Sequence, residues 1–187
     1  MIITAGKYKG RKIIAPDEKI TRPTLSKVRM SVFNILQSLI DFEESSFLDM
    51  FAGSGIMGLE AVSRGFKKIV AIEKNVRSAK ILKENFSNIT PTPSSPVGRV
   101  SERQEMFDIY IGDSLKILSN FDEIFDVIYI DPPYFSGVYE QSLNVVKNIA
   151  KNIVILEHIK DVDFLGYEII KQKKYGDKFL TFLRNQN

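Results

Sequence analysis

Cysteine is absent from this chain of 187 residues. The absence excludes disulfide bonds and fits a reducing, cytosolic environment. It also excludes chemistry that needs a thiolate, such as cysteine-bound zinc, an iron–sulfur cluster or methylation of a pyrimidine ring carbon through cysteine. The single histidine, His158, cannot form a metal cluster by itself, and we expect it in an ordinary surface or core position at a strand end. The sequence therefore predicts no metal.

Long apolar runs are missing as well. No stretch of about 18 consecutive apolar residues occurs, so no membrane span is predicted. The N-terminus carries charges where a signal peptide requires an apolar region, and we therefore expect a cytoplasmic protein. Hydrophobic residues make up 44% of the chain, which is enough for one domain with a substantial core.

Positive charge is concentrated near the N-terminus. Residues 1–30 contain eight Lys or Arg and two acidic residues, a balance of +6, although the net charge of the chain is only +3. The remaining residues therefore sum to −3. A polyanionic partner held by this segment would explain the asymmetry, and so would an ordinary solvated face. On the first interpretation, the candidate RNA-binding residues are Lys7, Lys9, Arg11, Lys12, Arg22 and Arg29.

The N-terminal segment has its own pattern. Residues 2–16 predict two short strands around Gly10, a β-ribbon, and a loop containing Pro23 follows. Apolar residues at helical spacing then predict a helix that Ser26 caps and that ends near Leu39. We interpret residues 1–40 as a basic RNA-binding ribbon and helix packed on a domain formed by residues 41–187.

From residue 46 onward, short β-rich runs alternate with helical segments. Strands are predicted at 46–51, 67–73, 106–112, 125–131 and 152–158, and helices at about 57–65, 75–87, 114–120 and 138–150. Such alternation predicts a largely parallel sheet with helices on both faces. The final runs, 166–176 and 178–184, meet at Gly176-Asp177 and predict an antiparallel hairpin. Residues 88–106 are rich in Pro, Ser and charge, and are interpreted as a long mobile surface loop.

The first chemical motif joins the strand that begins at residue 46 to the next helix. Its sequence is Asp49-x-Phe51-Ala52-Gly53-Ser54-Gly55-x-x-Gly58. We expect Gly53 and Gly55 to let the backbone approach a ligand closely. The same spacing satisfies G-x-G-x-x-G, which is weak evidence alone. However, Asp49 would repel a dinucleotide pyrophosphate, whereas it suits the ammonium group of S-adenosylmethionine (SAM).

Acidic residues also end the next two strands. Glu73 is placed to accept the ribose hydroxyls of an adenosine, and Asp113 to reach the adenine amino group. Each acid alone is better explained as a helix cap or solvated loop residue, and Asp113 in particular could simply cap the helix that follows. Together they predict a ligand site at the carboxyl edge of the sheet. The expected cofactor-binding residues are Asp49, Phe51, Ala52, Gly53, Gly55, Glu73, Lys74, Asp113 and Ser114.

The second motif, Asp131-Pro132-Pro133-Tyr134, ends the fourth parallel strand. An exocyclic base amine is a poor nucleophile because its lone pair is delocalised into the ring. Asp131 and the carbonyl of Pro132 can each accept one N–H hydrogen bond and so turn the lone pair toward a methyl donor. Two prolines hold that carbonyl in place, and Tyr134 offers a ring on which a flipped base can stack.

These motifs resemble those of the class I amino-methyltransferases, and more narrowly those of the bacterial 16S rRNA guanine-N2 methyltransferase family RsmD. The matching segments are Ala5-Gly6-x-x-x-Gly10-Arg11-Lys12, Arg22-Pro23-Thr24-x-x-x-Val28-Arg29, Phe33-Asn34-x-Leu36, Asp49-x-Phe51-Ala52-Gly53-Ser54-Gly55-x-x-Gly58-Leu59-Glu60-Ala61 and Asp131-Pro132-Pro133-Tyr134. The resemblance implies a Rossmann-like, seven-stranded fold and a monomeric, SAM-dependent enzyme without metal. It also implies a 16S rRNA substrate, presented in a small-subunit assembly intermediate. The chain departs from the family pattern at residues 88–106, which are longer than this family needs.

Three other functions are considered. An NAD-dependent dehydrogenase would use the glycine pattern but leaves Asp49 and the Asp131 turn unexplained. A DNA adenine-N6 methyltransferase would use the same Asp131 motif but needs a target-recognition domain for which 187 residues leave no room. A non-catalytic RNA-binding assembly factor would need only the basic segment.

Overall fold

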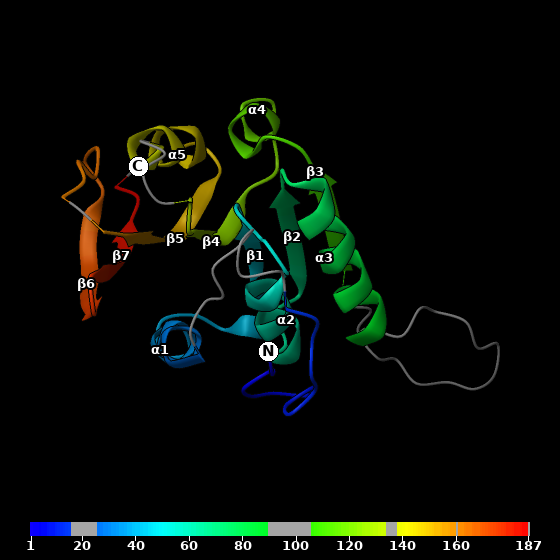
Figure 1. The fold of residues 1–187 in the computed structure, drawn as a ribbon. Coiled ribbons are helices and arrows are strands. Elements are labelled where there is room, and N and C mark those ends of the chain that lie inside the picture. The colour runs from blue at the N-terminus through cyan, green and yellow to red at the C-terminus, as the bar shows by residue number, and fades with distance from the viewer. Residues whose placement is uncertain (16–25, 90–105, 134–137, 160, 187) are drawn as a thin grey trace.

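The computed structural model describes residues 1–15, 26–89, 106–133, 138–159 and 161–186 (Figure 1). Its helices are α1 (Ser26–Leu36), α2 (Ile56–Ser63), α3 (Val76–Ile89), α4 (Ser114–Leu118) and α5 (Tyr139–Val146), with a 3-10 turn η1 (Phe42–Glu44). Its strands are β1 (Ser46–Asp49), β2 (Lys68–Glu73), β3 (Met106–Ile111), β4 (Phe125–Ile130), β5 (Ala150–His158), β6 (Glu168–Tyr175) and β7 (Lys178–Arg184).

The strands form one seven-stranded sheet in the order β3-β2-β1-β4-β5-β7-β6. Strands β1 to β5 are parallel, and β7 is antiparallel to both β5 and β6. The predicted fold class is confirmed: a mostly parallel sheet with a terminal antiparallel hairpin. From β1 the chain runs outward through β2 and β3 on one side of the sheet, and β4 and β5 lie on the other side. Open α/β sheets bind ligands at such a switch point, here between β1 and β4.

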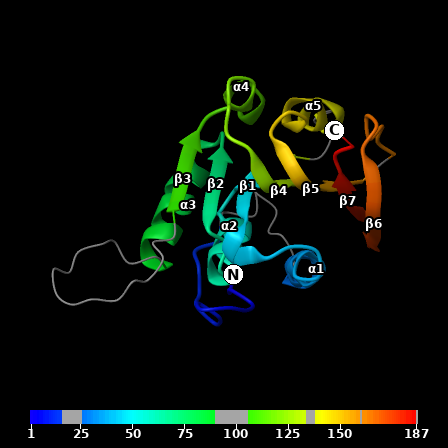
Figure 2. The same cartoon turned by 180° about the vertical axis from the view of Figure 1, so that it is seen from behind.

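Successive residues of a strand point to opposite faces of the sheet, and a hydrophobic core lies on each face. Phe47 of β1 packs with residues of α1, α2 and α3, whereas its neighbour Leu48 packs with residues of α4 and α5. Figures 1 and 2 show these two groups of helices on opposite faces. Strand β4 is buried along its whole length because helices cover both of its faces.

The N-terminal segment shares the core of the first face. Ile3, Tyr8 and Ile13 pack in the same cluster as Phe33 of α1 and Leu59 of α2. The predicted strands around Gly10 are not formed as regular strands: one antiparallel bridge, Ile2 with Lys12, joins the two arms within the described part of this segment. Turns over residues 5–10 occupy the rest, and there the N–H groups of Lys7 and Tyr8 donate hydrogen bonds to the carbonyl and the hydroxyl of Ser63 in α2.

Some helices and loops begin or end at other residues than the sequence predicts. Helix α1 ends at Leu36, three residues early, in a turn where the Ser38 hydroxyl donates a 2.7 Å hydrogen bond to the Ile35 carbonyl. Helix α5 ends at Val146 because Ala150 already pairs with β4. Of the predicted 88–106 loop, residues 88–89 belong to α3 and Met106 opens β3. Residues 90–105 lie outside the described part of the chain, as does the Pro23 loop.

His158 has a core position, one of the two that its sequence context allowed. Its Nε2 lies 2.8 Å from the Thr181 hydroxyl, and its ring stacks on Phe179 at 5.3 Å between centroids. Within the described ranges, no helix has the length and apolar character needed to cross a membrane.

Candidate active site at the carboxyl edge of the sheet

Strand register brings three of the predicted acids to one edge. Asp49, the last residue of β1, pairs with Ala71 of β2 on one side and with Tyr129 of β4 on the other. Glu73 and Asp131 each lie two residues beyond those partners, at the carboxyl ends of their strands. The three carboxyl groups therefore surround the turn that follows β1.

Asp49 is a buried carboxyl group with only 1% of its surface exposed. Its Oδ2 accepts no hydrogen bond from the described residues. Burial, together with the charges of Asp131 and Glu73, raises the pKa of Asp49 to about 8, while the backbone N–H groups of Phe51 and Gly58 oppose this rise. A buried acceptor without a partner is costly, and a bound cation would relieve that cost.

Glu73 is held against the glycine turn by two backbone hydrogen bonds. The N–H of Gly53 donates to Oε2 at 2.7 Å, and the N–H of Asn75 donates to Oε1 at 2.6 Å. Because each carboxylate oxygen can accept more than one hydrogen bond, both remain able to accept from ribose hydroxyls. The same contacts hold the carboxylate close to the turn.

Asp113 has the capping role that the sequence left open. It precedes α4, and its side chain accepts a hydrogen bond from the N–H of Lys116 at 3.3 Å. It also pairs with Lys74 at 2.9 Å, and this hydrogen bond lowers the pKa of Asp113. Two of the predicted cofactor residues are thus joined to each other, while Ser114 is buried in the first turn of α4. Contact of these residues with an adenine stays a prediction.

Gly55 has a packing role in the structure, in addition to the close approach to a ligand that stays a prediction. Its φ of +82° lies in the left-handed region, and a Cβ there would come within 2.3 Å of Leu82 and 2.9 Å of Phe86, both on α3. A Cβ on Gly58 would meet the same Phe86 at 3.0 Å. These two glycines therefore allow close packing of α2 and the turn against α3, and Gly55 also provides the backbone conformation of the turn.

Asp131 adjoins a buried polar network that the sequence motifs did not predict. Lys178 of β7 lies 3.9 Å from Asp131 and 2.8 Å from Glu157 of β5, and the Tyr129 hydroxyl donates a short hydrogen bond to Glu157. Burial raises the pKa of Asp131, and the Lys178 charge opposes the rise. Burial and the charge of Asp131 raise the pKa of Glu157 to about 8. Glu157 follows the apolar run of β5, and this acid is the feature of the sequence that could have indicated the network.

The rest of the Asp131 motif is partly described. Pro132 is buried and Pro133 is exposed, which places the rigid segment at the surface of the sheet edge. Tyr134 lies outside the described residues, so the stacking role assigned to its ring stays a prediction. Among the described residues, no cluster of three or more His, Asp or Glu side chains is suited to hold a metal ion.

Four of the six predicted RNA-binding residues are exposed: Lys7, Lys9, Arg11 and Lys12. The Arg11 guanidinium lies 5.1 Å from the centre of the Tyr8 ring and donates a 3.3 Å hydrogen bond to the Ile89 carbonyl. Arg22 lies outside the described residues. Contact with RNA stays a prediction for these five residues.

The assignment of Arg29 to the RNA surface is wrong. Only 1% of Arg29 is exposed; its Nη2 donates to the Ile2 carbonyl at 2.9 Å and its Nε lies 3.5 Å from Glu60. Glu60 is fully buried and also accepts hydrogen bonds from the N–H and the hydroxyl of Thr4, at 2.7 and 3.0 Å. Arg29 therefore ties α1 to α2 and to the N-terminal segment instead of facing a partner.

These residues fit SAM at the edge of the sheet. Asp49 presents a buried carboxylate oxygen without a hydrogen-bond partner among the described residues, as the SAM ammonium group requires. Glu73 lies beside it and retains acceptor capacity for hydroxyl groups. Asp131 follows β4 at the same edge, and its contact with a methyl acceptor stays a prediction.

The sheet order and its acidic edge define the class I methyltransferase fold, and solved structures of the same class match it. A putative methyltransferase, yhhF, from Escherichia coli superimposes with a TM-score of 0.81 at 21% identity, over 100% of this chain and 99% of that one. A putative methylase, HI0767, from Haemophilus influenzae gives a TM-score of 0.76 at 26% identity, over 100% and 98%.

Sequence comparison identifies the family. Residues 1–184 match the family described as Conserved hypothetical protein 95, and the chain belongs to that family, the RsmD family indicated by its motifs. The Ribosomal RNA small subunit methyltransferase D of Haemophilus influenzae is 34% identical over 181 residues, which cover 93% of this chain and 88% of that protein. The putative rRNA methyltransferase YlbH of Bacillus subtilis is 28% identical, with 87% and 85% covered.

Proposed function

We propose that this protein transfers the methyl group of SAM to the exocyclic N2 amine of a guanine in 16S rRNA. The observation that carries the proposal is the buried Asp49 carboxyl group on the same sheet edge as Asp131, with an Oδ2 that accepts no hydrogen bond from the described part of the chain. We further propose that the enzyme acts in the cytoplasm as a monomer, on an assembly intermediate of the small ribosomal subunit.

The printed names of the relatives support an rRNA substrate. The Haemophilus influenzae relative is named as a small-subunit rRNA methyltransferase, and the Bacillus subtilis relative as a putative rRNA methyltransferase. The guanine N2 amine is the finer part of the proposal, and it depends on the Asp131 motif and the family resemblance.

The residues of the edge would divide the work as follows. Asp49 binds the SAM ammonium group, and Glu73 accepts the ribose hydroxyls. SAM supplies an electrophilic methyl group on a sulfonium. Asp131 and the carbonyl of Pro132 accept the two N–H groups of the guanine amine and hold its nitrogen in line with that methyl group. Lys178, 3.9 Å from Asp131, favours the ionised form of this carboxyl group, which is the form that accepts hydrogen bonds at both oxygens.

The basic N-terminal segment would hold the RNA. Lys7, Lys9, Arg11 and Lys12 are exposed on residues 1–15, and we propose that they contact phosphates while the target base enters the site. Arg22 belongs to the same proposal through its position beside Pro23. In this arrangement residues 1–40 serve RNA binding although their apolar side chains belong to the common core.

The proposal is tested by mapping the product. Small-subunit particles that lack the modification are incubated with the protein and labelled SAM, and the labelled nucleoside is identified after digestion. We expect N2-methylguanosine from 16S rRNA, and no label with already modified particles. Label in adenine of duplex DNA would support the DNA methyltransferase alternative instead. Stabilisation by NAD and not by SAM in thermal unfolding would support a dehydrogenase.

A further inference from the structure

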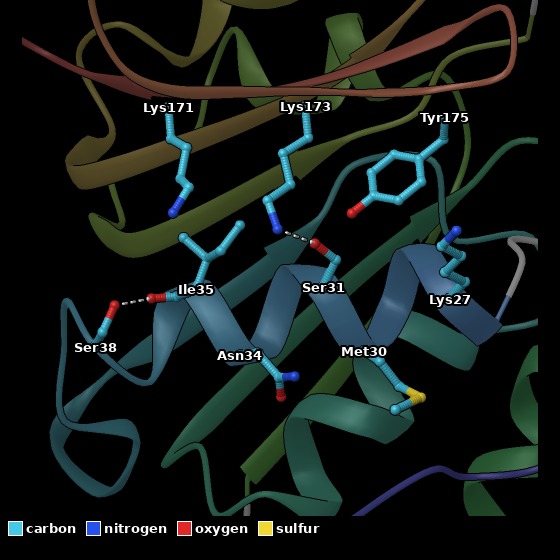
Figure 3. Close-up of a pocket in the computed structure, with 9 residues that line it drawn as sticks. All are labelled: Lys27, Met30, Ser31, Asn34, Ile35, Ser38, Lys171, Lys173 and Tyr175. Atoms are coloured by element: carbon cyan, nitrogen blue, oxygen red, sulfur yellow. Dashed lines mark hydrogen bonds between the residues drawn. The ribbon is translucent and has the colours of Figure 1, made fainter.

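A basic groove lies apart from the acidic edge, between α1 and the edge strand β6 (Figure 3). Its volume is about 490 Å³. The side chains that line it are Lys27, Met30, Ser31, Asn34, Ile35 and Ser38 from α1 and the turn after it, and Lys171, Lys173 and Tyr175 from β6. This set contains three lysines and no acid. The groove is therefore cationic along its length.

The lysines of β6 face α1 because of the sheet register. Lys171 pairs with Phe182 and Lys173 with Leu180, and both partners belong to the core cluster that α1 also covers. Residues two apart on a strand share a face and lie about 6.6–6.8 Å apart. Figure 3 shows Lys171, Lys173 and Tyr175 in a row that points toward the helix. Lys174, between them in the sequence, instead lies over the Phe179 ring on the opposite face.

The charges of this row are not neutralised by carboxylates of the described residues. Lys173 donates a 3.4 Å hydrogen bond to the Ser31 hydroxyl, and Lys27 lies 5.9 Å from the centre of the Tyr175 ring. Edge strands carry lysines in any case, since charge there discourages pairing with another sheet. That explanation does not require a groove whose described lining residues include an aromatic ring and no acid.

One end of the groove is linked to the catalytic edge through Lys178 of β7. Tyr175 is the register partner of Lys178, and Lys178 lies 3.9 Å from Asp131. Strands β7 and β5 lie between β6 and β4 in the sheet, and Lys178 connects Tyr175 to the residue that is proposed to hold the target amine. Lysines spaced along a groove with an aromatic side chain at one end are the combination that binds single-stranded nucleic acid.

We propose that the α1–β6 groove binds a single-stranded segment of the RNA substrate next to the target nucleotide. Lys171 and Lys173 contact successive phosphates, and Tyr175 stacks a base at the end nearest Asp131. The proposal rests on the proposed function, because that function supplies the RNA. It adds a second contact surface to the one formed by the N-terminal segment.

The test compares neighbouring residues of one strand. Binding of a labelled single-stranded RNA oligonucleotide is measured by fluorescence anisotropy between about 0.05 and 0.2 M salt for Lys173→Gln, Lys171→Gln/Lys173→Gln and the matched control Lys174→Gln. Each phosphate that a variant no longer neutralises should reduce the slope of log affinity against log salt by about 0.7, equivalent to about fivefold weaker binding near 0.1 M. Tyr175→Ala should weaken binding about tenfold and leave the slope unchanged.

The expected result is binding that is about fivefold weaker for Lys173→Gln, about 25-fold weaker for the double variant and almost unchanged for Lys174→Gln. SAM affinity and thermal midpoint should be unchanged in all of them. Equal losses in Lys173→Gln and Lys174→Gln, or none in either, overturn the proposal. So does weaker binding of poly-glutamate without weaker binding of RNA, which would assign the groove to an acidic protein.

Methylation by the wild-type chain separates this proposal from the function on which it rests. If wild-type protein methylates 16S rRNA but the groove variants bind RNA normally, the groove proposal alone fails. If wild-type protein binds RNA through the groove and methylates no RNA, the proposed function fails. No RNA binding by the wild-type chain overturns the groove proposal directly.

Discussion

At the residue scale, the proposed active site contains more acidic side chains than basic ones, and these acids are largely shielded from water. Burial raises the pKa values of Asp49, Asp131 and Glu157, and the charges of neighbouring acids add to the rise for Asp49 and Glu157. Lys178 pairs with Asp131 and Glu157. Such a site is destabilised without ligand. SAM carries positive charge on both its ammonium and its sulfonium groups, so its binding would offset that cost.

Replacing Asp49 tests this destabilisation, because the substitution should change how the free energy of unfolding depends on pH. Because the pKa of Asp49 is about 8 in the folded chain and 3.8 ordinarily, the folded state binds more protons between these values. The free energy of unfolding contributed by this group therefore falls as pH rises through that window. Asp49→Asn should remove the fall and be more stable than wild type by about 1–3 kcal/mol at pH 8, with little difference near pH 4.

The same variant should bind SAM at least about tenfold more weakly, since an amide provides no charge for the ammonium group. Urea unfolding at several pH values and calorimetric titration with SAM provide the two measurements. Glu44→Gln, at an exposed acid, is the control and should change neither. Unchanged SAM affinity in Asp49→Asn would show that the cofactor lies elsewhere.

Asp131 has two possible roles that substitutions separate. If it positions the amine, asparagine retains an acceptor oxygen at the same reach and should retain measurable single-turnover methylation. Asp131→Ala retains no acceptor and should lose at least about 2–3 kcal/mol of transition-state stabilisation. Both variants should still bind SAM. Near-complete and equal loss in both, with SAM binding intact, would indicate that Asp131 abstracts a proton.

At the scale of elements, the N-terminal segment combines a structural inner side with a basic outer side. Ile3, Tyr8 and Ile13 are buried, while Lys9, Arg11 and Lys12 are exposed. The exposed side can therefore change without loss of the core. This separation makes the proposed role of the segment in RNA binding testable by substitution.

Neutralising Lys9, Arg11 and Lys12 together should weaken RNA binding and leave SAM affinity unchanged. The slope of log affinity against log salt should fall by about 0.7–0.9 for each phosphate that these side chains neutralise in the wild-type complex. Filter binding with 16S rRNA over a range of salt concentrations measures it. Lys67→Gln with Lys151→Gln, two exposed lysines paired with acids elsewhere, is the control. An unchanged slope would make the three residues ordinary solvated charges.

At the scale of the whole molecule, Glu60 joins three parts of the fold. Its carboxylate contacts Thr4 of the N-terminal segment, Arg29 of α1 and Arg64, just after α2. The carboxylate is fully buried, so these partners replace water entirely. These contacts fix the position of the basic N-terminal segment relative to α2, the helix that follows the glycine turn.

Glu60→Gln should lower the free energy of unfolding by about 2–4 kcal/mol, because it removes the negative charge that two guanidinium groups share in a buried place. Urea unfolding followed by circular dichroism measures the change. Glu44→Gln removes an exposed pair, Lys67 with Glu44, and should change stability by less than about 1 kcal/mol. Equal, small effects of the two substitutions would contradict the linking role of Glu60.

Local patterns in the sequence were sufficient for the order of strands and helices, the terminal hairpin and the edge where Asp49, Glu73 and Asp131 meet. The reason is that periodicity and turn residues report short-range structure, and parallel strands bring their carboxyl ends to one edge whatever the remaining packing. The boundaries of α1 and α5 were less accurate because turns and neighbouring strands determine where a helix ends.

Only the tertiary structure decided which charges are buried and which are exposed. Arg29 looks like its basic neighbours in the sequence, yet its contact with Glu60 joins residues far apart in the chain. The contacts of Lys178 with Asp131 and Glu157 and the groove between α1 and β6 have the same origin. Burial and electrostatic environment depend on the packing of distant segments, which a local pattern does not contain.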